Sequence, residues 1–109
     1  MLVDFKPLLK TLEGREMNLG RDPEGKIIPA TLGNVAIGAI VAPVEVNGQA
    51  QALEGLIAVE RYNLANRIYE ATEPLDLTVE EVALIKKRIA ENYTTPLVVG
   101  QAWKMIEGK

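Results

Sequence analysis

The sequence predicts an α+β fold that is mainly helical, in which an N-terminal β-hairpin packs against a bundle of about four helices. Apolar residues recur at helical spacing after residue 31, whereas residues 1–30 mix apolar positions with turn-forming Gly, Pro and Asp. At 109 residues, with 48% hydrophobic and 25% charged residues, the chain has the size and composition of one globular unit. We therefore expect a single domain over residues 1–109, with a hairpin region at 1–30 and a helical region at 31–109.

The hairpin prediction depends on turn chemistry. Glu13–Gly14 is typical of a turn that leads into residues 15–19, and residues 21–26 concentrate Asp, Pro and Gly. Because Pro fixes its own φ and Gly accepts a positive φ at low steric cost, we expect a surface turn at 21–26.

The first helix is expected to be intrinsically weak. Thr31 can cap a helix over residues 32–42, and Pro43 blocks its continuation. Gly33 and Gly38 lower its helix propensity. Glycines at this spacing also resemble part of a phosphate loop, but no Lys-Thr or Lys-Ser pair follows them, so a core helix is the better interpretation.

A longer helix is expected over residues 51–72, after a loop around Asn47–Gly48. Its apolar stripe at helical spacing comprises Leu53, Ile57, Leu64, Ile68 and Ala71. We expect this helix to form the centre of the core.

Two further helices have clear start signals. Thr78 and Glu81 form a capping-box pattern before a helix over 79–91, and Pro96 is typical of the first position of a helix over 96–107. In the helix 79–91, periodicity places Val79 on the apolar face and Leu84 and Arg88 on the side toward solvent. The helix 96–107 is apolar over most of its circumference, so it is either deeply buried or shared with a partner.

The composition removes most catalytic schemes. The chain contains no His, no Cys and no Ser, so serine and cysteine nucleophile triads and Cys/His zinc sites are excluded. Carboxylates remain as possible acid–base groups, and the candidates are Glu60, Asp76, Glu80 and Glu81. Helix caps and solvated helix faces account for these acids more simply, and we expect neither an enzyme nor a cofactor or metal.

The chain shows no sign of export or of membrane insertion. Its first fourteen residues mix charged with apolar residues, unlike a signal peptide. The longest apolar run, residues 35–44, is too short to span a bilayer and contains Gly38 and Pro43. We expect a cytoplasmic protein.

Partner contacts are the leading functional hypothesis. Tyr62 and Tyr69 lie seven residues apart on one flank of the helix 51–72, and the helix 96–107 has more apolar residues than a surface helix needs. Core packing remains an alternative for all of these residues. The candidate partner-binding residues are Leu97, Val99, Trp103, Met105, Ile106, Tyr62 and Tyr69.

A nucleic-acid-binding regulator is the alternative hypothesis. The basic cluster Lys86, Lys87 and Arg88 could contact phosphates, and the last two helices could form a helix-turn-helix. The second of these helices offers mainly apolar side chains to base edges, so we rank nucleic-acid binding below protein binding.

The chain resembles small bacteriophage and prophage proteins of unassigned function. The resemblance lies in LTVEEVALIKKRIA at residues 77–90, PLVVGQAW at 96–103, and the earlier Leu12-Glu-Gly and Thr31-Leu-Gly. It implies a phage accessory or assembly factor in the cytoplasm of a bacterial host cell, with itself or a phage or host protein as partner. It assigns no role to any residue.

Overall fold

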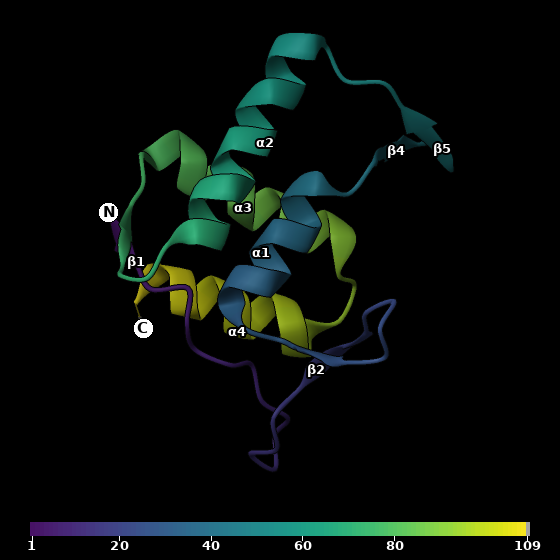
Figure 1. The fold of residues 1–109 in the computed structure, drawn as a ribbon. Coiled ribbons are helices and arrows are strands. Elements are labelled where there is room, and N and C mark those ends of the chain that lie inside the picture. The colour runs from purple at the N-terminus through teal and green to yellow at the C-terminus, as the bar shows by residue number, and fades with distance from the viewer. Residues whose placement is uncertain (109) are drawn as a thin grey trace.

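The computed structural model describes residues 1–108, which form four helices and six short strands. The helices group around α1, with α2 above it, α3 behind it and α4 below it in the view of Figure 1. This arrangement confirms the α+β, mainly helical fold. The helices are α1 (Leu32–Val41), α2 (Gly55–Glu70), α3 (Val79–Asn92) and α4 (Pro96–Glu107). The strands are β1 (Leu2–Val3), β2 (Asn18–Arg21), β3 (Ile27–Pro29), β4 (Val44–Val46), β5 (Gln49–Gln51) and β6 (Leu75–Asp76).

The centre of the core is α1, and the prediction that the longer helix forms the centre is wrong. Six of the ten residues of α1 are buried, and the helix packs against both α2 and α3 and also contacts α4. Thr31 caps α1 as predicted, because its hydroxyl accepts a hydrogen bond from the N–H of Asn34 at 3.0 Å. A helix made largely of Gly, Ala, Val and Ile is thin enough to be surrounded by other elements on several sides.

Helix α2 belongs to the core only through its second half. Leu64, Ala65 and Ile68 are buried, whereas Leu53 and Ile57 of the predicted stripe are exposed. The helix also begins later than predicted, at Gly55, because residues 49–51 pair with β4 as strand β5. The stripe therefore continues beyond the body of the protein that could bury it.

The N-terminal hairpin is confirmed in β2 and β3, which pair antiparallel across the turn at 22–26. Asp22 organises this turn, since its carboxylate accepts hydrogen bonds from the N–H groups of Glu24 and Lys26. A second hairpin, β4–β5, lies in the region expected to be helical. Asn47 and Gly48 both have positive φ, at 54° and 79°, which is the two-residue type I′ turn that favours a tight hairpin. The remaining pair, β1–β6, joins the start of the chain to the segment before α3.

Helices α3 and α4 begin where their cap signals predicted. Both hydrogen bonds of the Thr78–Glu81 capping box are present, and Pro96 is the first residue of α4. Three side chains of α3 differ from the periodicity prediction. Val79 is exposed because the first turn of α3 extends past the core, and Leu84 packs partly against the core.

Arg88 is the third difference on α3, because it is buried, with 4% of its surface exposed. Its guanidinium donates hydrogen bonds to the carbonyl oxygens of Ala39 at 3.1 Å and Ala42 at 2.8 Å, and it also pairs with Glu91. These carbonyls lie at the C-terminal end of α1, where a helix leaves its last acceptors without backbone donors. Arg88 therefore joins α3 to α1.

Candidate functional site

Residues 44–63 form a segment, here called the arm, that extends from the body of the protein. It comprises the hairpin β4–β5 and the first half of α2, and Figure 1 shows both reaching away from the other helices. All twenty of its residues are exposed except Val44 and Arg61, which are half-buried. The arm therefore has little of its own surface packed against the body.

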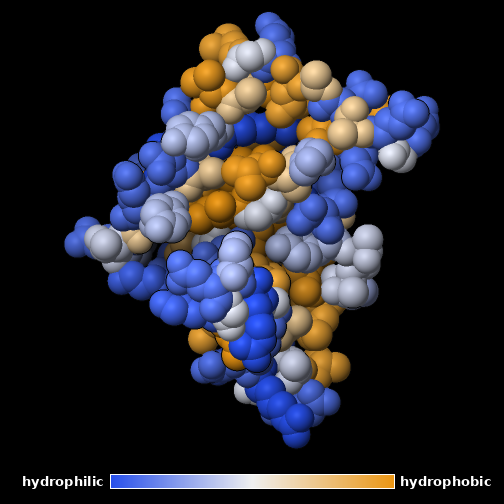
Figure 2. Space-filling view, turned by 45° about the vertical axis from the view of Figure 1, so that its right-hand side comes forward, coloured by the Kyte–Doolittle hydropathy of each residue, from blue (hydrophilic) through white to orange (hydrophobic). Residues whose placement is uncertain are grey.

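The arm carries a group of exposed apolar side chains. Leu56 and Tyr62 each expose 66% of their surface and Val59 exposes 54%, and Val46, Leu53 and Ile57 are exposed as well. Figure 2 shows apolar residues gathered over the top of the molecule, where Figure 1 places the start of α2, and again in the hollow beside it. Monomeric proteins rarely leave a contiguous apolar surface of this kind uncovered unless it serves in an interaction.

A hollow of about 330 Å³, here called the inner groove, separates the arm from the end of α1. Its walls are mostly apolar and include Val41, Pro43, Leu53, Ala58 and Tyr62. Arg61 also lines it, and the Nε and Nη1 atoms of this guanidinium are buried without a hydrogen-bond partner within residues 1–108. A buried donor without an acceptor costs about 1–3 kcal/mol, and more when it is charged, so Arg61 marks a position that a partner could complete.

The predicted partner-binding residues divide into three groups. Tyr62 and Tyr69 are both well exposed on α2, as an interaction surface requires. Leu97, Val99 and Met105 of α4 are half-buried, and Val99 and Met105 pack against the core. Ile106 is 1% exposed, so it lies in the core and cannot contact a partner in this structure. The surplus apolar surface of α4 is therefore largely used within the chain.

Trp103 is tied to α3 by three contacts. Its indole Nε1–H donates a hydrogen bond to the carbonyl oxygen of Lys86 at 3.1 Å, and the Lys86 ammonium lies 4.7 Å from the ring centroid. The same ammonium pairs with Glu107 at 2.6 Å. The tryptophan borders a shallow depression of about 510 Å³ between α3 and α4, but its polar group is already satisfied by the protein.

The basic cluster at 86–88 does not present three cations to solvent. Arg88 is buried in contact with α1, Lys86 is held between Trp103 and Glu107, and Lys87 is exposed. A phosphate backbone would therefore meet one accessible charge here, whereas electrostatic binding to nucleic acid draws on several phosphate contacts.

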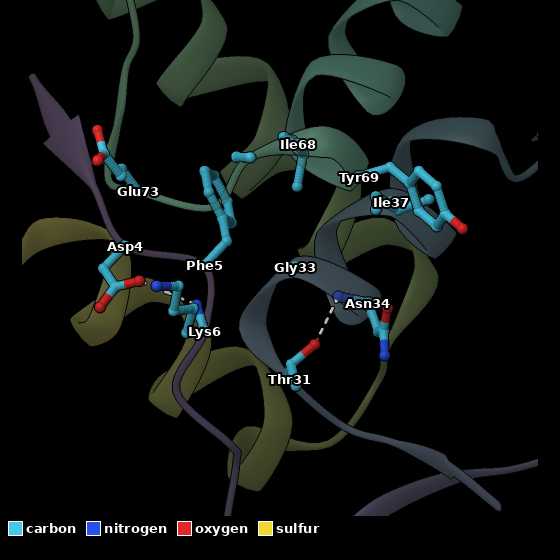
Figure 3. Close-up of a pocket in the computed structure, with 11 residues that line it drawn as sticks. Asp4, Phe5, Lys6, Thr31, Gly33, Asn34, Ile37, Ile68, Tyr69 and Glu73 are labelled. Atoms are coloured by element: carbon cyan, nitrogen blue, oxygen red, sulfur yellow. Dashed lines mark hydrogen bonds between the residues drawn. The ribbon is translucent and has the colours of Figure 1, made fainter.

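A pocket of about 300 Å³ opens at the start of α1, but its helix N-terminus has no free donors. Figure 3 shows residues of the N-terminal segment on one side of this pocket and Tyr69 and Ile37 on the other. The first N–H groups of α1 are used within the chain, because Leu32 donates to Pro7, Gly33 donates to Phe5 and Asn34 donates to Thr31. The glycines of α1 therefore do not form a phosphate site.

Three of the four candidate carboxylates share one groove. Glu60, Glu80 and Glu81 line a hollow of about 560 Å³ between α2 and the start of α3, whereas Asp76 pairs with the N-terminal ammonium instead. The Glu81 carboxylate is engaged by the N–H of Thr78 and by Arg67. Across residues 1–108, no group of three or more acidic side chains is arranged to hold a metal ion.

The electrostatics of Glu81 are those of a structural cap. Burial by itself raises the pKa of the Glu81 carboxyl, but hydrogen bonds from Thr78 and the charge of Arg67 outweigh it, and the pKa lies below its ordinary value of 4.5. A general acid needs the opposite shift, because it must hold its proton near neutral pH.

We expect the stabilising effect of the Glu81 charge to depend on pH. Because the folded state lowers this pKa, the stabilisation is present above pH 4.5 and is lost as the pH falls through the lowered pKa. Glu81→Gln should therefore lower the free energy of unfolding by about 0.5–1 kcal/mol at pH 7. In urea titrations at pH 7 and pH 3 this difference should shrink toward zero at the lower pH, and an equal difference at both would contradict the assignment.

Comparisons with known proteins do not identify the chain. No protein-family model, curated protein or solved structure matches it. In the part of the chain that the structure describes, no helix is long and apolar enough to cross a membrane. The candidate site is therefore defined by the arm and its inner groove alone.

Sequence reasoning identified Tyr62 but missed the arm. The Asn47–Gly48 pair is a strong hairpin signal, and it would have moved the start of α2 to Gly55. Leu56 and Val59 lie off the predicted apolar stripe, so they already indicated that α2 carries apolar residues on a second face.

Proposed function

We propose that this chain is a non-catalytic protein-interaction protein and that the arm is its partner-binding surface. The observation that carries the proposal is the group of exposed apolar side chains on residues 44–63, beside a groove that contains an unpaired guanidinium. Apolar surface with a few polar groups at its centre is the composition of protein interfaces.

The energetics of the arm favour a covered state. A two-stranded hairpin is marginally stable in water by itself, and short helical segments gain most of their stability from packing. Leu56, Val59 and Tyr62 would each contribute apolar area to an interface, at about 25 cal/mol for each Å² removed from water. A partner on the arm would therefore stabilise the segment that the body supports least.

The resemblance to phage and prophage proteins suggests the biological setting. An accessory or assembly factor acts by contacting another protein, and it requires none of the nucleophiles that this sequence lacks. The partner in this setting is a second copy of the chain or another phage or host protein. We do not adopt the nucleic-acid alternative, because Lys86 and Arg88 are engaged within the chain.

Photo-crosslinking in the native cell would test the proposal. A benzophenone analogue of phenylalanine would replace Tyr62 on the arm, Trp103 on α4, or Leu12 as a control. Leu12 is 93% exposed and lies in the N-terminal region, away from both surfaces. We expect a discrete covalent adduct from position 62 and none from position 12, because only the arm would be in contact with a partner.

Each pattern of adducts has a defined meaning. An adduct from position 103 alone would move the interaction surface to α4, as the sequence first suggested, and would contradict the arm. No adduct from either position would contradict the interaction function itself. The mass of the adduct would show whether the partner is a second copy or a different protein.

A further inference from the structure

Arg61 is the one arginine in the helices that has no ion pair or hydrogen bond within the described chain. Arg67 pairs with Glu81, and Arg88 contacts three backbone carbonyls and Glu91. Arg61 lines the inner groove on one side of α2 and the groove of Glu60, Glu80 and Glu81 on the other, while its Nε and Nη1 atoms are buried. The Nη2 atom is not among the buried atoms, so a carboxylate can approach the guanidinium from that side.

The groove around Arg61 limits what can supply this carboxylate. The inner groove is walled by apolar side chains and has a volume of about 330 Å³, which suits one or two side chains and not a whole helix. Its occupant must therefore bring an acidic side chain and an apolar side chain close together on one segment.

The arm itself contains such a segment. Leu53 and Glu54 lie directly before α2, and both are exposed. Glu54 is the N-cap residue of α2, but its side chain makes no capping hydrogen bond and no ion pair within residues 1–108. It is seven residues before Arg61, which is two helical turns and about 10 Å along the axis. The two side chains lie on the same face of the helix and are too far apart to pair with each other.

This arrangement is self-complementary. An acid at one end of a helix face and a base at the other end match a second copy of the same face when the two helices run antiparallel. Each Glu54 then faces the Arg61 of the other copy, and each Leu53 approaches the Tyr62 of the other copy beside the inner groove. Ile57 and Ala58 lie at the centre, where the small side chain of Ala58 allows close approach. A contact of this kind closes with two copies and leaves none of its surface free for a third.

We propose that two copies of this chain pair arm to arm with α2 antiparallel, so that Glu54 of each copy forms an ion pair with Arg61 of the other. The inference rests on the proposed function, since it names a second copy as the partner of the arm. Electrostatic complementarity of this kind determines the register of an interface as well as the choice of partner.

Charge reversal tests the pairing directly. The purified full-length protein would be measured by light scattering and sedimentation over a concentration series. Arg61→Glu and Glu54→Arg should each weaken dimerisation by about 100-fold or more, because each places like charges together at two symmetric contacts. The double variant carrying Arg61→Glu and Glu54→Arg should recover the dimer, since the pair is restored with opposite polarity.

A matched control separates this specific pair from general charge effects. Glu70→Arg changes the same amount of charge on the same helix, at the end away from the arm, and should leave the dimer unchanged. Circular dichroism would confirm that each variant is folded. If a reversal prevents folding, Arg61→Gln and Glu54→Gln replace it and should weaken the dimer less, each removing one partner without repulsion.

Three outcomes would overturn the inference. They are a wild-type monomer at every concentration, a dimer that neither reversal weakens, and a double variant that is folded but does not recover. A monomer that still gives an adduct with another protein from position 62 would leave the proposed function in place with a different partner. A dimer that is insensitive at the arm, together with no adduct from position 62, would contradict both.

Discussion

Arg88→Ala is expected to lower the free energy of unfolding by about 3–5 kcal/mol, as breaking a buried charged contact does. The guanidinium is 4% exposed and donates to the carbonyl oxygens of Ala39, Ala42 and Pro43. Its removal leaves these acceptors without a donor in a region that the packing of α1 against α3 closes to water. Urea titration followed by circular dichroism would measure the change.

Lys87→Ala is the control for this prediction. Lys87 precedes Arg88 on the same helix but is exposed, so its replacement should change the free energy of unfolding by no more than about 0.5 kcal/mol. Equal effects of the two variants would show that Arg88 does not support the end of α1.

Gly33→Leu is expected to destabilise the protein by about 1–3 kcal/mol through overpacking. A Cβ atom at this position would lie 3.2 Å from the carbonyl oxygen of Phe5 and 3.3 Å from its Cβ. The N–H of Gly33 also donates to that carbonyl at 2.9 Å, so the two backbone segments cannot separate without losing this hydrogen bond. Figure 3 shows Gly33 facing the segment that contains Phe5.

Gly38 provides the comparison within the same helix. A Cβ atom there would meet the Tyr93 hydroxyl at 3.5 Å, which is an ordinary contact. Gly38→Ala should therefore stabilise the protein by about 0.5–1 kcal/mol, because alanine has the higher helix propensity. Thermal unfolding of both variants would check the opposite signs, and a shift in the same direction for both would contradict the close approach at Gly33.

Local signals were enough to place most of the helices. Thr31, Thr78 with Glu81, and Pro96 act within one turn of their own positions, and each marks the observed start of a helix. The turn at 21–26 was equally local, because Asp22 and Gly25 supply its hydrogen bonds and its positive φ. Such features depend on neighbours in sequence, so they can be predicted without the tertiary structure.

The candidate site was predicted only in part. The exposed position of Tyr62 agrees with its choice as a partner contact, but the α4 residues chosen beside it are largely packed within the chain. Helical periodicity shows which residues share a face, and it contains no information on what that face meets. The same limit explains Arg88, whose face was expected in solvent and instead meets the end of α1.

The sequence by itself determined the absence of histidine, cysteine and serine chemistry, the positions where helices begin, and the two turns that close hairpins. The tertiary structure decided that α1 lies at the centre, that the first half of α2 extends beyond the core, and that Arg61 is left without an acceptor. The physical reason is that caps and turns are formed by adjacent residues, whereas burial depends on which distant segments arrive at each face. In this protein no segment of the described chain covers the arm, and that is the feature from which its function is inferred.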